Sequence, residues 1–110
     1  MDNHPVIEGY FAAIRGRDIE ALLRLFAEDA VMILPDGREL DGKGSLRAMY
    51  EHLFAADPPL PAPTAAIITA DGLATEIEST LPDGSVRQTA NFFHLDDGGL
   101  IRRLSVYRRG

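Results

Sequence analysis

The sequence predicts an α+β fold, with three helices in its first half and an antiparallel sheet in its second half. Up to about residue 54, apolar residues recur at helical spacing. After a proline-rich segment at 57–63, runs of β-favouring residues alternate with Asp-Gly turns. A length of 110 residues fits one domain, so we expect residues 1–110 to fold as a single domain.

The first two predicted helices each carry one apolar stripe. The first stripe follows the spacing i, i+3, i+4, i+7 and consists of Ile7, Tyr10, Phe11 and Ile14. Asp2 or Asn3 is expected to cap this helix, because short polar side chains accept from the free N–H groups of a first turn. A second helix is expected to begin at a cap on Asp18, to carry its stripe as far as Phe26, and to end at residues 28–29.

A buried strand and a third helix are expected next. Residues 31–34 form a short β-favouring run that a Pro-Asp-Gly turn ends. Ser45 is a suitable cap for the third helix, whose apolar stripe includes Met49 and Tyr50. The proline-rich residues 57–63 predict a stiff extended connector, since proline interrupts both helices and central strands.

The second half predicts four strands joined by tight turns. Asp-Gly pairs or a longer Asp-Asp-Gly-Gly stretch separate them, and glycine supplies the positive φ that such turns need. The expected strands are 65–70, 73–81, 85–95 and 100–108. Successive hairpins of this kind make an antiparallel meander.

Composition excludes several classes of function. A formal net charge of −6 and a sequence pI of about 4.9 argue against a nucleic-acid partner, which requires a basic patch. There is no cysteine, and the three histidines have no metal-ligand spacing, so we expect no metal site. No nucleotide-binding glycine pattern is present and no cofactor is expected. Without a signal-peptide pattern or a membrane-length apolar run, we expect a cytoplasmic protein with no membrane partner.

Four segments of the chain resemble one known group of proteins. They are residues 10–31, the Pro35-Asp-Gly turn, the start of the third helix at 42–46, and the final hairpin at 91–107. Together they resemble ketosteroid isomerase and the SnoaL-like polyketide cyclases of the nuclear transport factor two-like superfamily. The resemblance implies a cone-shaped α+β roll, with three N-terminal helices packed on a curved, mainly antiparallel sheet. It also implies a pocket for a small apolar ligand or substrate, and dimerisation through the outer face of the sheet.

The resemblance assigns roles to two polar residues. The oxyanion tyrosine of ketosteroid isomerase falls on Tyr10, whose hydroxyl would donate to developing negative charge. The alternative is a core tyrosine with a neutral hydrogen-bond acceptor. The protonated aspartate of that enzyme falls on Asn91, an amide that donates without any pKa shift. The alternative is a strand residue that satisfies the backbone or water.

The general base of the resembled enzyme falls on Leu34, which cannot accept a proton. Asp36 could replace it at the pocket mouth, although Pro-Asp-Gly is also an ordinary turn sequence. Glu76 and Glu78 share one face of their strand by alternation. They form an acid–base pair if that face lines the pocket, or an ordinary solvent face if Ile77 points inward, and hydrophobicity favours the second arrangement.

By the same resemblance, the pocket walls include Met32, Leu34, Met49, Phe93, Leu104 and Val106, with Glu76 and Glu78 as further candidate lining residues. The other face of the last two strands carries Phe92, His94, Ser105 and Tyr107. This set is too aromatic for an ordinary solvent face and is a candidate homodimer surface.

Three functions remain open at this point. The first is an enzyme without a cofactor that isomerises, cyclises or dehydrates a small apolar molecule, with Tyr10, Asn91 and Asp36 as candidate catalytic residues. The second is a non-catalytic ligand-binding or association module, which Leu34 at the base position favours. The third is a dimeric scaffold whose core is filled, and an open pocket would contradict it.

Overall fold

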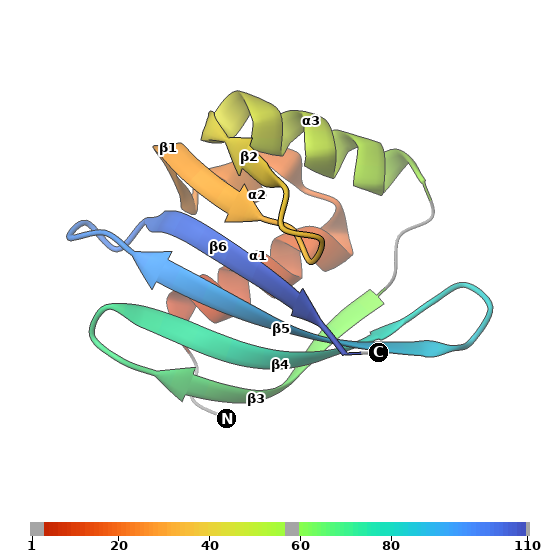
Figure 1. Cartoon of the computed structure of the whole chain (residues 1–110). Helices are drawn as coiled ribbons and strands as arrows, with labels where there is room; N and C mark the ends of the chain where they lie inside the picture. Colours follow the sequence, from red (N-terminus) through yellow and green to blue (C-terminus); the bar gives the residue numbers. More distant parts are fainter. Residues whose placement is uncertain (1–3, 57–59, 110) are drawn as a thin grey trace.

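The computed structural model describes residues 4–56 and 60–109 and confirms the α+β prediction (Figure 1). Within these residues the helices are α1 (Pro5–Gly16), α2 (Ile19–Leu23) and α3 (Gly42–Ala55). The strands are β1 (Phe26–Ile33), β2 (Glu39–Asp41), β3 (Leu60–Ile68), β4 (Gly72–Thr80), β5 (Val86–Leu95) and β6 (Ile101–Arg108). They form one sheet in the order β2-β1-β6-β5-β4-β3. Only the β1–β6 pair is parallel, as expected of a mainly antiparallel sheet.

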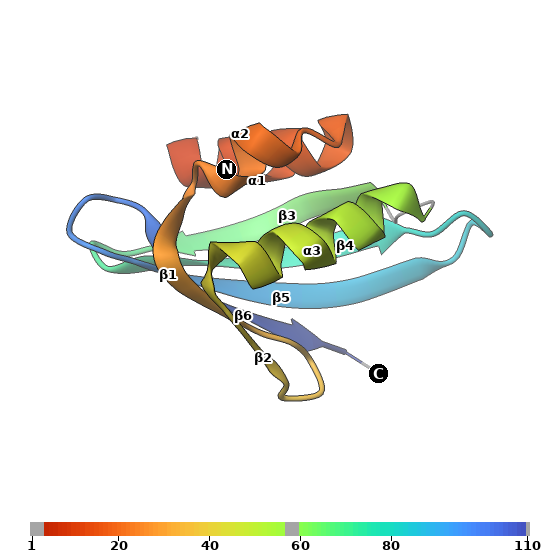
Figure 2. The same cartoon turned by 90° about the horizontal axis from the view of Figure 1, so that it is seen from above.

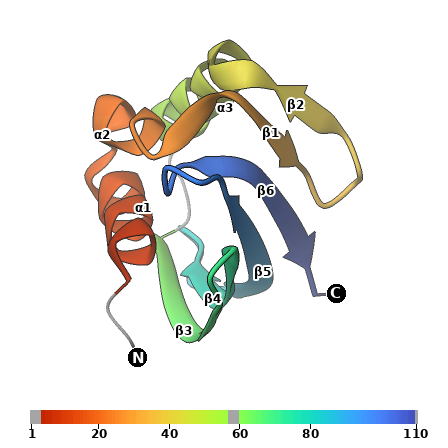
Figure 3. The same cartoon turned by 90° about the vertical axis from the view of Figure 1, so that its left-hand side faces the viewer.

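The three helices lie on the same side of the sheet, as the view from above shows (Figure 2). The sheet curves around them (Figure 3), with α1 packed against β3 and α3 packed against β1. The short helix α2 contacts both of the longer helices. This arrangement leaves space between α1, α3 and the concave face of β4, β5 and β6, where the pocket described below lies.

The start of α1 differs from the prediction. His4 is the N-cap residue, and its Nδ1 accepts a hydrogen bond from the backbone N–H of Val6 at 3.2 Å. The predicted caps, Asp2 and Asn3, lie outside the described residues. Pro5 occupies the first turn, where the missing N–H costs nothing.

The second helix is shorter than predicted, because α2 ends at Leu23 and Phe26 begins β1. Phe26 pairs with Ile101 of β6 and is fully buried. The register of the β1–β6 pair shifts between Phe26 and Val31, so the polar residues between them are not paired regularly with β6. Helical spacing therefore did not decide this segment, since pairing with β6 buries the same apolar residues as strand. Similarly, α3 begins at Gly42 with Asp41 in the cap position, so Ser45 is not its cap.

The proline-rich segment is also more regular than expected. Residues 57–59 lie outside the described residues, but β3 already begins at Leu60 and includes Pro61 and Pro63. These prolines are tolerated because β3 is an edge strand. The side of an edge strand that faces away from the sheet has no neighbouring strand to which N–H groups must donate. The three-residue strand β2, which the sequence did not predict, forms the opposite edge.

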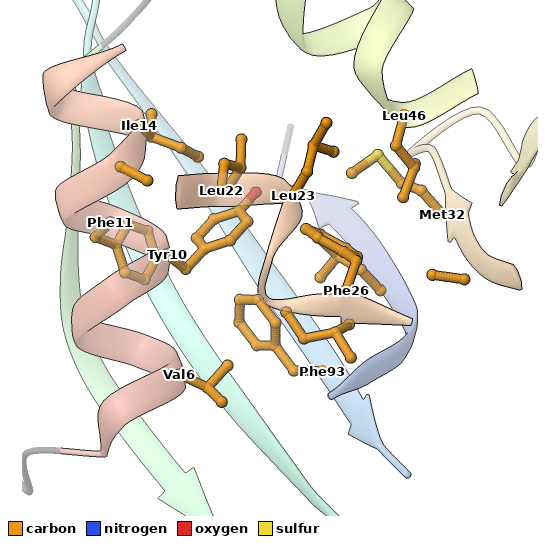
Figure 4. Close-up of a cluster of buried hydrophobic side chains, with 14 of the residues drawn as sticks. Val6, Tyr10, Phe11, Ile14, Leu22, Leu23, Phe26, Met32, Leu46 and Phe93 are labelled. Atoms are coloured by element: carbon orange, nitrogen blue, oxygen red, sulfur yellow. The ribbon is translucent and has the colours of Figure 1, made fainter. Parts of the chain in front are cut away.

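The core fills the space between the helices and the central strands (Figure 4). Tyr10 extends from α1 toward Leu22 and Phe93, while Phe26 lies between the sheet and α3 (Figure 4). Phe93 and Leu104 face each other across β5 and β6 and are 1% and 0% exposed. The concave sheet face is therefore closed by packing at one end.

Gly72 provides a test of this packing. A Cβ atom at Gly72 would lie 2.6 Å from the backbone carbonyl oxygen of Phe93, so Gly72→Ala must displace a central strand. We expect a loss of about 1–3 kcal/mol in the free energy of unfolding, measured by urea denaturation. Gly44→Ala in α3 is the matched control, because it meets nothing within 4 Å and should stabilise the helix by up to about 1 kcal/mol. Equal stability of Gly72→Ala and the wild type would contradict this account.

Candidate functional site: a pocket between helices and sheet

A pocket of about 300 Å³ lies between the helices and the concave sheet face. Helices α1 and α3 form one wall, and the inner faces of β4, β5 and β6 form the other. Its lining residues are Tyr10, Phe11, Ile14, Met32, Leu34, Met49, Tyr50, Leu53, Pro61, Ile77, Ser79, Arg87, Thr89, Asn91 and Val106. This open space contradicts the hypothesis of a scaffold with a filled core.

A pair of buried tyrosines forms the polar centre of the pocket. The hydroxyls of Tyr10 and Tyr50 share a hydrogen bond of 2.8 Å, and the two residues are 5% and 1% exposed. Burial raises the pKa of Tyr10 to about 12, although its contacts with Tyr50 and Asn91 act in the opposite direction. Burial also raises the pKa of Tyr50 well above its usual value, and the proximity of Tyr10 adds to this effect. Both hydroxyls therefore keep their protons at neutral pH.

Asn91 lies beside this pair on the inner face of β5. It is 5% exposed, and its side chain contacts the hydroxyl of Tyr10. Its cross-strand neighbour is Thr75 of β4, which is also buried. Among the described residues, the Thr75 hydroxyl has no hydrogen-bond partner. The inner sheet face thus places several polar groups next to the tyrosine pair, inside an otherwise apolar layer.

This arrangement can polarise a carbonyl group. When one tyrosine hydroxyl donates to the other, the accepting hydroxyl still has its own proton to donate. The amide of Asn91 supplies a second neutral donor at the same place. Two donors that converge on one oxygen in a dry site stabilise negative charge on that oxygen more strongly than water-exposed donors do.

The described residues that line the pocket include no conventional general base. Leu34, at the position of the base in ketosteroid isomerase, lies on the pocket wall. Among the described residues that line the pocket there is no aspartate, glutamate or histidine. The donor set at Tyr10 and Asn91 is therefore present without a proton acceptor of ordinary basicity.

Asp36 does not take the place of the base. Its side chain is exposed and does not line the pocket. It accepts a hydrogen bond from the backbone N–H of Arg38 at 3.0 Å and pairs with Nε of Arg38 at 2.8 Å. These contacts, the backbone one first, lower the pKa of Asp36 and keep it ionised. The prediction of a catalytic role is corrected to a turn-forming role in the Pro-Asp-Gly sequence.

Glu76 and Glu78 lie on the outer face of the sheet, so their assignment to the pocket lining is wrong. Strand alternation points Ile77 and Ser79 inward and exposes the two glutamates. Both line a different hollow of about 410 Å³, together with Gln88 and Tyr107. That hollow lies against one sheet face only, whereas the inner pocket has helices opposite the sheet.

The predicted apolar walls divide into two groups. Met32, Leu34, Met49 and Val106 line the pocket. Phe93 and Leu104 do not reach it, because they are buried in the core next to Met32, in register across β5, β6 and β1. On β5 and β6, the pocket lining therefore ends at Asn91 and Val106.

Sequence reasoning did not identify Tyr50, Arg87 and Thr89 as pocket residues. Tyr50 was placed in an apolar helical stripe, and nothing in that stripe indicated a partner 40 residues away. Arg87 and Thr89 share the odd-numbered phase of Asn91 along β5. That alternation was the available signal, and it was not extended to the start of the strand.

No group of acidic, histidine or cysteine residues in the described part of the chain is arranged to hold a metal ion. Likewise, none of the helices within the described ranges is long and apolar enough to span a bilayer.

Three helices on one curved, mainly antiparallel sheet give the chain the nuclear transport factor two-like fold. The sequence model of the SnoaL-like domain matches residues 7–104, and the chain belongs to this family. A search of the curated proteins found no match.

Several solved structures share the fold. A candidate polyketide cyclase from Sinorhizobium meliloti is 24% identical, with a TM-score of 0.85 and coverage of 96% of each chain. A candidate ketosteroid isomerase from Kribbella flavida is 21% identical, with a TM-score of 0.85 and coverage of 96% of this chain and 76% of that one. A protein from Sphaerobacter thermophilus is 26% identical, with a TM-score of 0.82 and coverage of 96% and 94%.

The buried tyrosine pair predicts a loss of stability at alkaline pH. An exposed tyrosine has a pKa of 10.0, and burial in the fold raises the pKa of Tyr10 to about 12. As the pH rises, Tyr10 therefore loses its proton in the unfolded chain before it does so in the folded chain. The stability linked to this proton is fully present below pH 10 and is lost as the pH rises toward 12.

Urea denaturation at about pH 10 and about pH 11 measures this loss. The Tyr10→Phe variant lacks the titrating group, so its decrease in the free energy of unfolding should be smaller than that of the wild type by about 1 kcal/mol. The same decrease in both proteins would show that Tyr10 does not titrate as a buried group.

Proposed function

We propose that the chain binds a small, mostly apolar molecule in the inner pocket and holds a carbonyl oxygen of that molecule at Tyr10 and Asn91. The observation that carries this proposal is the Tyr10–Tyr50 hydrogen bond beside Asn91, in a pocket whose other walls are largely apolar. Pockets of this kind bury an apolar ligand and fix its orientation through a few polar groups. Both buried hydroxyls are neutral donors at neutral pH, which suits a neutral carbonyl acceptor.

A second candidate is an isomerase- or cyclase-type enzyme that uses the same donors. The neighbouring hydroxyl of Tyr10 and amide of Asn91 favour it, because two donors to one oxygen would stabilise an enolate formed from a bound ketone. Loss of one such donor typically lowers turnover by about 100- to 1000-fold. The reaction would need a proton acceptor other than the described lining residues, such as water or a basic group of the substrate itself. The binding function needs no such acceptor, and for this reason we place it first.

Butyrophenone, an apolar aryl ketone, tests both candidates in one experiment. Ligand-observed NMR in deuterated buffer should show binding to the wild type, with affinity reduced up to about tenfold in Tyr10→Phe and in Asn91→Leu because each loses one hydrogen bond. Tyr107→Phe is the matched control, because it removes an exposed hydroxyl on the other face of the sheet and should bind as the wild type does.

The α-protons of the ketone separate the two candidates. Binding without accelerated loss of their signal supports a binding module. Exchange for deuterium faster than in buffer, and slowed by Tyr10→Phe, supports the enzyme. Equal affinity of Tyr10→Phe, Asn91→Leu and the wild type would contradict the role of the donor pair.

We further propose that the outer sheet face joins two copies of the chain. Phe92 and Tyr107 form an edge-to-face pair on this face, with ring centroids 5.5 Å apart, and are 42% and 60% exposed. Ile67, in the same cross-strand row as Phe92, is 70% exposed. Carboxylates of β4 and the arginine Arg103 of β6 flank the apolar residues. A second copy related by a two-fold axis presents the same apolar surface and charges of both signs.

His94 belongs to this surface and is electrically neutral there. Its Nε2 lies 3.1 Å from the guanidinium of Arg103, which can only donate. Partial burial, with added repulsion from Arg103 and Arg102, lowers the pKa of His94. A neutral histidine costs less to bury against a partner than a charged one does.

Phe92→Glu tests the dimer. Sedimentation analysis of the wild type should give about twice the chain mass of 12.0 kDa, and Phe92→Glu should give the mass of one chain, since a carboxylate in an apolar interface is costly. Leu100→Glu is the control, because Leu100 is similarly exposed but precedes β6 in a turn. A monomeric wild type, or a dimer that survives Phe92→Glu, would contradict the proposal.

A further inference from the structure

An arginine lies on the inner sheet face at the open end of the pocket. Arg87 follows the first residue of β5 and pairs across the sheet with Ser79 of β4, which in turn pairs with Pro61 of β3. All three residues line the pocket. Arg87 shares the inward phase of Thr89 and Asn91, so one strand contributes a cation, a hydroxyl and an amide to the same cavity.

The guanidinium of Arg87 lacks a partner in the part of the chain that the structure describes. Its Nε is buried and has no hydrogen-bond acceptor there, and no carboxylate pairs with the side chain within those residues. A buried N–H of a charged group without an acceptor is costly, by more than a neutral donor would be. An acceptor brought by a ligand would remove this cost.

The charge around Arg87 favours an anion. Arg87 also lines an adjoining hollow of about 310 Å³, which includes Arg108 and Arg109. Neither this hollow nor the pocket has an aspartate or glutamate among its described lining residues. On the outer face, Arg108 and Arg109 also line the hollow that contains Glu76 and Glu78. Arg87 is therefore the cation that favours a negative group at the pocket mouth, since no carboxylate is among the described residues that line the pocket with it.

The two polar ends of the pocket are separated by a length of strand that a small molecule can span. Arg87 and Asn91 are four residues apart on the same face of β5, which places their Cα atoms about 13 Å apart. The walls between them, which include Ile77, are mainly apolar.

From these observations we infer that Arg87 binds a carboxylate of the ligand, while Tyr10 and Asn91 hold its ketone oxygen. The ligand class is then an apolar keto acid. A guanidinium offers parallel N–H donors that match the two oxygens of one carboxylate, and a single cation in an apolar pocket balances a single negative charge. This inference rests on the proposed function, because it assumes a ligand whose carbonyl reaches the tyrosine pair.

A matched pair of probes separates this inference from the proposed function. Benzoylpropionate carries an aryl ketone and a carboxylate, and benzoylpropionamide is its neutral counterpart of nearly the same shape. We expect the wild type to bind the acid about tenfold more tightly than the amide, as measured by isothermal titration calorimetry at neutral pH.

Substitutions at Arg87 locate the effect. Arg87→Met keeps much of the apolar stem and should bind the two probes with nearly equal affinity, because the acid loses its ion pair whereas the amide loses at most a neutral acceptor's hydrogen bond. Arg87→Lys should restore part of the preference, since it restores the charge without the planar fork. Arg102→Met is the control for net charge, because Arg102 is exposed and lines neither hollow, and it should keep the wild-type preference. Thermal unfolding of each variant verifies that the fold is intact.

Each outcome is decisive. A wild type that binds the amide but shows no preference for the acid overturns the role of Arg87 and leaves the proposed function standing. A preference that persists in Arg87→Met, or that Arg102→Met also abolishes, overturns it as well. Failure of the wild type to bind either probe contradicts both the proposed function and this inference.

Discussion

The hydrogen bond between Tyr10 and Tyr50 is the contact on which the arrangement of this molecule depends. It joins α1 to α3 across 40 residues of sequence, at a point where the two tyrosines are 5% and 1% exposed. Burying either hydroxyl without a hydrogen-bond partner would cost free energy. The hydrogen bond between the two hydroxyls offsets this cost for both. The ring of Tyr10 also packs edge-to-face on Phe93 of β5. The pair thereby fixes both helices above the concave sheet and places the polar centre of the pocket.

Alternation along β4 and β5 gives the two faces of the sheet different chemistry. The inward phase combines apolar residues with Thr75, Arg87 and Asn91, whereas the outward phase carries exposed carboxylates and aromatic rings. Since side chains on a strand have a period of two, a change on one face leaves the other face largely unaffected. The proposed ligand site and the proposed dimer surface can therefore be altered independently in this fold.

The sequence predicted the framework better than the site, for identifiable physical reasons. Asp-Gly turns and β-favouring runs located the last four strands because tight turns have strict local requirements. Phe26 was misassigned because its spacing fits a helix, and only pairing with Ile101 makes it strand. For the glutamates of β4 the sequence left two arrangements open, and the outward one that hydrophobicity favoured is confirmed by the buried Ile77 between them. Tyr50 belongs to the pocket through a contact with a segment 40 residues away, which local patterns do not encode, whereas strand alternation from Asn91 indicates the inward position of Arg87.

The two edges of the sheet also limit how copies of this chain can meet. An unprotected edge strand offers a row of free N–H and C=O groups to which a strand of another molecule can add. Here Pro61 and Pro63 remove N–H donors from β3 at one edge, and β2 at the other edge is only three residues long. Growth of a continuous intermolecular sheet, the first step toward fibrils, is therefore disfavoured at both edges. A protein that leaves aromatic side chains exposed on a sheet face gains from this protection, because face contacts end at a pair whereas edge contacts can propagate without limit.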